Sequence, residues 1–87
     1  MAIESDRQAD ALYVTLADRP VASTKSLRDG RVIDFAANDS VVGIEFLGVS
    51  AGIDLAGLPQ EGVVQRAIDE YNARVPDERR IRLRTAS

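Results

Sequence analysis

The sequence predicts an α+β domain, in which a four-stranded antiparallel β-meander carries one C-terminal amphipathic helix packed on a face. Short segments of alternating apolar and polar residues fill the first half of the chain, and turn-forming residues separate them. A segment with helical periodicity follows. We assign residues 1–75 to a single domain and treat residues 76–87 as an arginine-rich C-terminal segment.

The first two predicted strands differ in polarity. Residues 11–16 alternate, with Tyr13 and Thr15 on the face opposite the apolar side chains. After a turn at Pro20, residues 21–27 form a weaker, polar strand that suits the edge of a sheet. Tyr13 is therefore expected on the outer sheet face, away from the helix.

A hairpin is predicted over residues 31–47, following an Asp-Gly turn signal. If the apolar side chains of its two strands share a face, the two residue numbers in each cross-strand pair add up to an odd value. A sum of 79 would oppose Asp34 and Glu45, two like charges. We therefore expect a sum of 77, which pairs Asp34 with Gly43 and leaves a two-residue turn at Asn38-Asp39.

A helix is predicted at about residues 59–72, because Pro59 suits a first turn and apolar side chains recur at helical spacing. Val75 should be non-helical, since it precedes a proline. The alternating segment 80–84 leaves two alternatives open. It forms a short fifth strand with its apolar side chains facing inward, or it is a frayed end.

The composition excludes several classes of function. The chain has no cysteine and no histidine, so disulfides, thiolate metal sites and the commonest general base at neutral pH are absent. Its one lysine, Lys25, points to the opposite strand face from Ser26, which rules out a serine–lysine pair there. No apolar run approaches the roughly 18 residues of a membrane span. We expect a cytoplasmic, bacterial, non-catalytic protein without a cofactor or membrane contact.

Charge is unevenly distributed along the chain. Residues 1–72 carry six basic and twelve acidic side chains, whereas residues 73–87 carry five arginines against two acids. This distribution argues against broad nucleic-acid binding, which requires a large basic face. Because an 87-residue chain buries a limited share of its surface, we expect it to form a homodimer or to bind a small protein partner.

Three sequence blocks together resemble the prokaryotic domain-of-unknown-function family 2283, over about residues 3–52. They read D-x-x-A-D-A-L-Y-V at residues 6–14, V-I-D-F at 32–35 and V-G-I-E-F-L at 42–47. The resemblance implies a small sheet domain with no established enzyme activity, some of whose members are encoded near toxin-like partners. It thus implies an antitoxin-like, partner-binding role.

The motif carboxylates Asp6, Asp10, Asp34 and Glu45 allow two interpretations. They bind a divalent cation or act as an acid/base pair, or they have structural roles in turns and on the outer sheet face. We favour the structural interpretation and assign no metal ligand, because no metal-binding sequence motif accompanies them.

The candidate interface residues are Tyr13, Arg80, Arg82 and Arg84, since aromatic and arginine side chains are enriched in protein interfaces. We favour a non-catalytic, self-associating interaction module. The alternatives are a carboxylate-lined site for a divalent metal or small ligand, and weak DNA binding through the arginine-rich tail.

Overall fold

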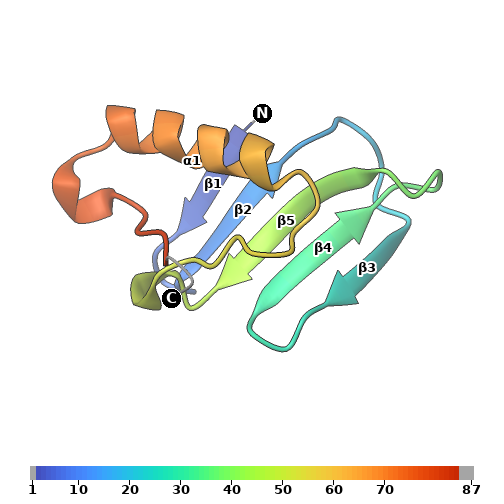
Figure 1. The fold of residues 1–87 in the computed structure, drawn as a ribbon, viewed down its shortest axis with the longest axis horizontal. Coiled ribbons are helices and arrows are strands. Elements are labelled where there is room, and N and C mark those ends of the chain that lie inside the picture. Colours follow the sequence, from blue (N-terminus) through green and yellow to red (C-terminus); the bar gives the residue numbers. More distant parts are fainter. Residues whose placement is uncertain (1, 85–87) are drawn as a thin grey trace.

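The computed structural model describes residues 2–84 and shows a five-stranded antiparallel sheet with one long helix on one face (Figure 1). The predicted α+β class, antiparallel sheet and C-terminal helix are confirmed. The elements are β1 (Ala2–Asp6), β2 (Ala11–Thr15), β3 (Ser23–Ser26), β4 (Arg31–Phe35), β5 (Val41–Leu47), the 3-10 helix η1 (Val49–Ala51), α1 (Glu61–Arg74) and the 3-10 helix η2 (Asp77–Arg79).

The strand order is β1-β2-β5-β4-β3, so the predicted meander is wrong in its connectivity. β2 pairs with β5, and the chain crosses to the far edge of the sheet before β3, β4 and β5 lead back. The reason is burial, because β5 is the most buried strand of the sheet and therefore lies at its centre. The polar β3 lies at the edge, as predicted.

The fifth strand comes from the N-terminus and not from the tail. β1 contributes only Ile3 to the core, which explains why its sequence carries a weak strand signal. Leu83 makes a single parallel bridge with Ile53, and the Ile53 N–H donates to the Arg82 carbonyl at 2.8 Å. Residues 80–84 are thus not a strand of the main sheet, and they are not frayed either, because backbone hydrogen bonds hold them against Ile53. Residues 85–87 of the predicted C-terminal segment lie outside the described residues.

The register predicted for the β4–β5 hairpin is confirmed, with Asp34 opposite Gly43. A bulge after Asp34 shifts the pairing beyond it by one residue, so the predicted two-residue turn is wrong. The Ala36 N–H donates to the Ser40 carbonyl at 2.9 Å, which closes a three-residue turn instead. Asp39 adopts the left-handed conformation in this turn, with φ 66°.

Helix α1 begins and ends two residues later than predicted. Gln60 caps it in a left-handed conformation with φ 55°, so Pro59 precedes the helix and does not lie in its first turn. Val75 is extended, as predicted, with φ −104° and ψ 156°.

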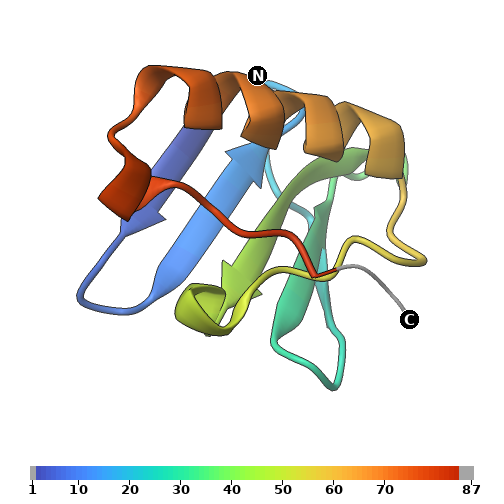
Figure 2. The ribbon, with the colours of Figure 1, turned by 60° about the vertical axis from the view of Figure 1, so that its left-hand side comes forward.

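The hydrophobic core lies between α1 and one face of the sheet. The loop after β5 and the C-terminal segment cover the same face, whereas no described element covers the opposite face (Figure 2). Burying a large aliphatic side chain stabilises the fold by about 1.5–3 kcal/mol. No helix in residues 2–84 is long and apolar enough to cross a membrane. The most deeply buried side chains are Leu12, Val14, Ile44, Phe46, Val64 and Ile68.

Candidate functional site

The outer face of the sheet, opposite α1, carries hydrogen-bonded side chains from β2, β4 and β3. The Tyr13 hydroxyl donates to Asp34 Oδ2 at 2.8 Å, and the Thr24 hydroxyl donates to Asp34 Oδ1 at 2.8 Å. Both oxygens of the carboxylate are therefore engaged. This arrangement fixes the Tyr13 ring across β5, which lies between β2 and β4.

Gly43 of β5 lies beneath the Tyr13 ring, and it is buried although it belongs to the outer face. A Cβ atom at this position would lie 2.7 Å from Tyr13 Cε2 and closer still to Cζ and the hydroxyl oxygen. Glycine is thus required here by close approach of a neighbouring side chain. The register supplies the alignment, because Thr15, Gly43, Asp34 and Thr24 are successive cross-strand partners and Tyr13 reaches this row diagonally.

Burial is the largest cause that raises the pKa of Tyr13 to about 12, followed by its hydrogen bond to Asp34. The negative charges of Asp34, Glu45 and Glu4 add to the effect. Tyr13 therefore keeps its proton at neutral pH and acts as a hydrogen-bond donor. A phenol in this state is a poor nucleophile and a poor general base.

Glu4 and Glu45 flank Tyr13, because both are its cross-strand partners. Together with Asp34 they make the middle of the outer face acidic. Among the described residues, the ion pairs are Arg31–Asp29 and Arg80–Asp77, and neither involves this face. The outer-face acidic charge is thus not neutralised within the part of the chain that the structure describes.

The other two motif carboxylates lie at one end of the sheet. Asp10 has a left-handed backbone with φ 53°, and its two oxygens accept from the Ser50 N–H at 2.9 Å and the Ser50 hydroxyl at 2.7 Å. Asp6 accepts the Ala9 N–H at 3.1 Å within the β1–β2 turn. Asp10 thereby ties that turn to η1.

The structure does not bring the carboxylates of the metal-site alternative together. Asp10 is engaged at the turn, whereas Asp34 and Glu45 lie on the outer face. In residues 2–84, no group of three or more acidic side chains is placed to hold a metal ion. The arrangement instead consists of hydrogen bonds that hold strands and loops in place.

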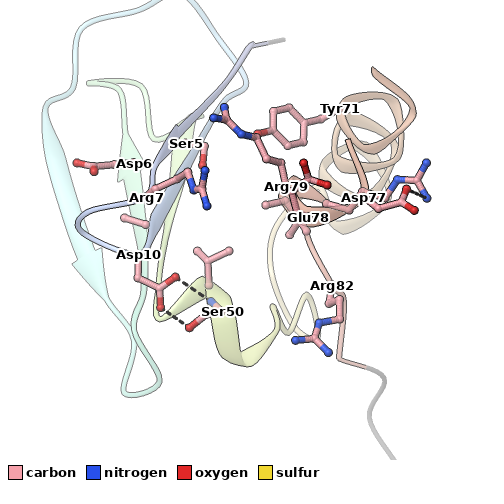
Figure 3. A pocket seen from close by; sticks show the side chains of 14 residues that line it. Ser5, Asp6, Arg7, Asp10, Ser50, Tyr71, Asp77, Glu78, Arg79 and Arg82 are labelled. Atoms are coloured by element: carbon pink, nitrogen blue, oxygen red, sulfur yellow. Dashed lines mark hydrogen bonds and ion pairs between the residues drawn. The ribbon is translucent and has the colours of Figure 1, made fainter. Parts of the chain in front are cut away.

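A groove of about 810 Å³ separates the β1–β2 turn from the C-terminal segment (Figure 3). The hydrogen-bonded pair Asp10 and Ser50 lies in one wall, and Tyr71 of α1 lies in the other. The basic side chains that line it are Arg7, Arg79, Arg80 and Arg82.

The candidate arginines of the tail have different surroundings. Arg80 pairs with Asp77 at 3.1 Å and donates from Nε to the Asn72 carbonyl at 3.2 Å. Arg82 lines the groove, whereas the Arg84 side chain packs against Gly52 and lines a separate pocket of about 230 Å³. Arg80 and Arg82 therefore share a site that Arg84 does not enter.

Sequence reasoning missed Thr24 and Arg7, and it considered Arg79 only as one of the tail arginines that could contact phosphates. A signal for the outer-face arrangement was present, because the register that pairs Asp34 with Gly43 brings Tyr13 close once β5 is placed beside β2. The groove arginines gave no such signal, since their approach depends on how the C-terminal segment packs.

The model of one protein family, described as "Protein of unknown function (DUF2283)", matches residues 3–50, which is more than half of the chain. The match includes the outer-face residues and the Asp10–Ser50 contact, and it ends before α1 and the C-terminal segment. No curated protein and no solved structure matches the chain.

Proposed function

Because the chain belongs to the DUF2283 family, whose description assigns no function, we propose from its geometry that it is a non-catalytic interaction module. Its outer sheet face binds the basic surface of a protein partner. The observation that carries this proposal is that the face is uncovered by the described chain while its acidic side chains have no ion-pair partner there.

The outer face is preorganised for binding. Tyr13 is fixed by its hydrogen bond to Asp34, and Asp34 is in turn fixed by Thr24. Side chains that are already ordered lose less conformational entropy when a partner binds. Tyrosine is also one of the residues that most often dominate interface energies.

The acidic charge limits how two copies can pair. In a two-fold symmetric contact between outer faces, Glu4, Asp34 and Glu45 of one copy would face the same residues of the other. Packed sheets lie about 10 Å apart, and two like unit charges at that distance repel by roughly 1.7 kcal/mol at an effective dielectric of 20. A basic partner turns this repulsion into attraction. The homodimer expected from the sequence stays a prediction and requires another surface.

An antitoxin-like role is one form of this proposal. In that case the basic partner is a toxin whose surface the acidic face covers. Only the family resemblance favours a toxin over another basic protein, and no residue contact distinguishes the two.

The first test is the mass of the isolated chain by light-scattering chromatography, over a range of concentrations at low and high salt. We expect no outer-face dimer at low salt. The proposal fails if a dimer forms that strengthens with salt and that Tyr13→Arg disrupts, because the face would then be an interface between copies.

The second test measures the binding of a ten-residue lysine peptide by fluorescence anisotropy. Glu4→Gln together with Glu45→Gln should weaken binding severalfold, since it removes charge from the outer face. Glu61→Gln together with Glu70→Gln removes equal charge from the exposed side of α1 and is the matched control. Equal weakening by both pairs would show that only net charge matters.

A further inference from the structure

We propose that the outer sheet face binds its partner through an arginine side chain, which stacks on the Tyr13 ring and pairs with Glu45. This inference rests on the function proposed above and adds the residue type that the face selects. It is carried by the charge of the face, the position of the ring and the carboxylates beside the ring.

The charge of the outer face is one-sided. Cross-strand partners line up in rows on this face, and within the five strands these rows contain no lysine or arginine. Lys25 and Arg31 are the basic residues of the strands. They lie on the opposite face, because their partners Ile33 and Phe46 belong to the core. The acidic side chains of the outer-face rows are Glu4, Asp6, Asp34 and Glu45.

The Tyr13 ring offers one open side. Its other side rests on Gly43, and Asp34 accepts the hydroxyl proton at 2.8 Å, so the ring lies across β5. Tyr13 is only half-buried, and no described element covers this face (Figure 2). The face of an aromatic ring attracts a cation that lies within about 6 Å of the ring centre. The open side of Tyr13 is therefore suited to a cation.

Carboxylates lie next to this position. Glu45 follows Gly43 on the same face of β5, about 7 Å along the strand. Asp34 lies at the hydroxyl end of the Tyr13 ring, and each of its oxygens has a second lone pair free to accept from a ligand. A cation on the ring would thus have a carboxylate within reach in two directions.

The pKa of Tyr13 supports this arrangement. Burial is the largest cause that raises it, and the negative charges of Asp34, Glu45 and Glu4 add to the effect. The same charges that disfavour a tyrosinate favour a cation beside the ring.

Arginine fits this position better than lysine. A planar guanidinium group can stack on the ring and donate two parallel hydrogen bonds to a carboxylate at its edge. The ammonium group of lysine is a compact, strongly hydrated charge that does neither. Both side chains carry the same charge, so attraction to an acidic face alone does not separate them. A preference for arginine over lysine is therefore the signature of the Tyr13 ring.

The test compares two fluorescent ten-residue peptides by anisotropy at low salt. Arginine alternates with glycine in one peptide, and lysine alternates with glycine in the other. The unmodified protein should bind the arginine peptide at least about threefold more tightly. Tyr13→Leu removes the ring and leaves the charge, so it should at least halve this preference. Tyr71→Leu is the matched control, because it removes the chain's other tyrosine, from α1, and should keep the preference.

A second variant makes the test independent of whether Tyr13→Leu folds, which thermal unfolding checks. Glu45→Gln keeps the shape of the side chain and removes one charge. It should weaken binding of the arginine peptide more than binding of the lysine peptide, since it removes the paired carboxylate. Glu61→Gln removes one charge from α1 and should leave the preference unchanged.

The outcomes separate this inference from the function on which it rests. Equal affinity for the two peptides, with binding that still depends on Glu4 and Glu45, would overturn the inference and leave the proposed function standing. A preference for arginine that survives both Tyr13→Leu and Glu45→Gln would also overturn it. Both proposals fail if Glu4→Gln together with Glu45→Gln weakens neither peptide more than the α1 control pair does.

Discussion

Gly43→Ala should destabilise the protein, and the cost should depend on Tyr13. The new Cβ atom would lie 2.7 Å from Tyr13 Cε2, so the ring must move and its hydrogen bond to Asp34 must lengthen or break. Gly43 does not have a positive φ, so backbone strain contributes nothing.

The magnitude follows from three contributions. Overpacking costs about 1–3 kcal/mol, and weakening a hydrogen bond to a charged group adds about 1.5 kcal/mol. Replacing glycine by alanine inside a strand returns about 0.5–1 kcal/mol. The free energy of unfolding should therefore fall by about 1.5–4 kcal/mol, which lowers the unfolding midpoint by roughly 6–30 °C for a chain of this size.

Urea unfolding of a double-mutant cycle tests the cause. In a Tyr13→Ala background the ring is absent, so Gly43→Ala should stabilise by about 0.5–1 kcal/mol. The change of sign corresponds to a coupling of about 3 kcal/mol between the two positions. Additivity of the two substitutions within about 0.5 kcal/mol would refute the reasoning, because the ring would then not be what excludes a side chain at residue 43.

Two further predictions concern Tyr13 and the C-terminal segment. In a Tyr71→Phe background, tyrosinate absorbance should show Tyr13 ionising near pH 12, and Asp34→Asn should lower that pKa. Because folding raises the pKa of Tyr13 from 10.0, the stability that its protonated form contributes is complete below pH 10 and is lost as the pH rises toward 12. Urea unfolding at each pH measures this loss. An unfolding midpoint that does not change with pH across this range would contradict the prediction. Asn72→Ala removes both hydrogen bonds to Ile81, so it should lower the free energy of unfolding by about 1–3 kcal/mol. It should also speed hydrogen exchange at the Ile81 amide more than at the β5 amides. An equal change in exchange rate at both places would mean that Asn72 does not hold the C-terminal segment.

The pairing of β4 with β5 could be predicted because it depends on local chemistry. Shared apolar faces and the like charges of Asp34 and Glu45 leave one favourable register, and the structure has it. The turn could not be derived in the same way. A bulge after Asp34 changes the number of residues in the β4–β5 turn without changing the apolar pattern of the strands.

The strand order is a tertiary property that alternation does not encode. Neighbours in sequence pair in most sheets, so a meander was the simplest expectation. Yet Val41–Leu47 is the longest strand, with five of its seven residues buried, and such a strand belongs at the centre of a sheet. With β5 between β2 and β4, Tyr13 crosses Gly43 to reach Asp34 on the outer face. The groove depends on Asn72 holding Ile81, a contact between irregular backbone and a helix end that no periodicity reveals.

The central position of β5 governs how this chain can fold. β2 and β3 are not neighbours, so a chain that ends before Val41 contains two separate hairpins with no shared core. Isolated hairpins are at most marginally stable in water. The strand synthesised last therefore joins both halves in one step, and a nascent chain gains no sheet until residues 41–47 have emerged. Folding should be cooperative and slower than for a true meander, since closing the sheet joins segments distant in sequence.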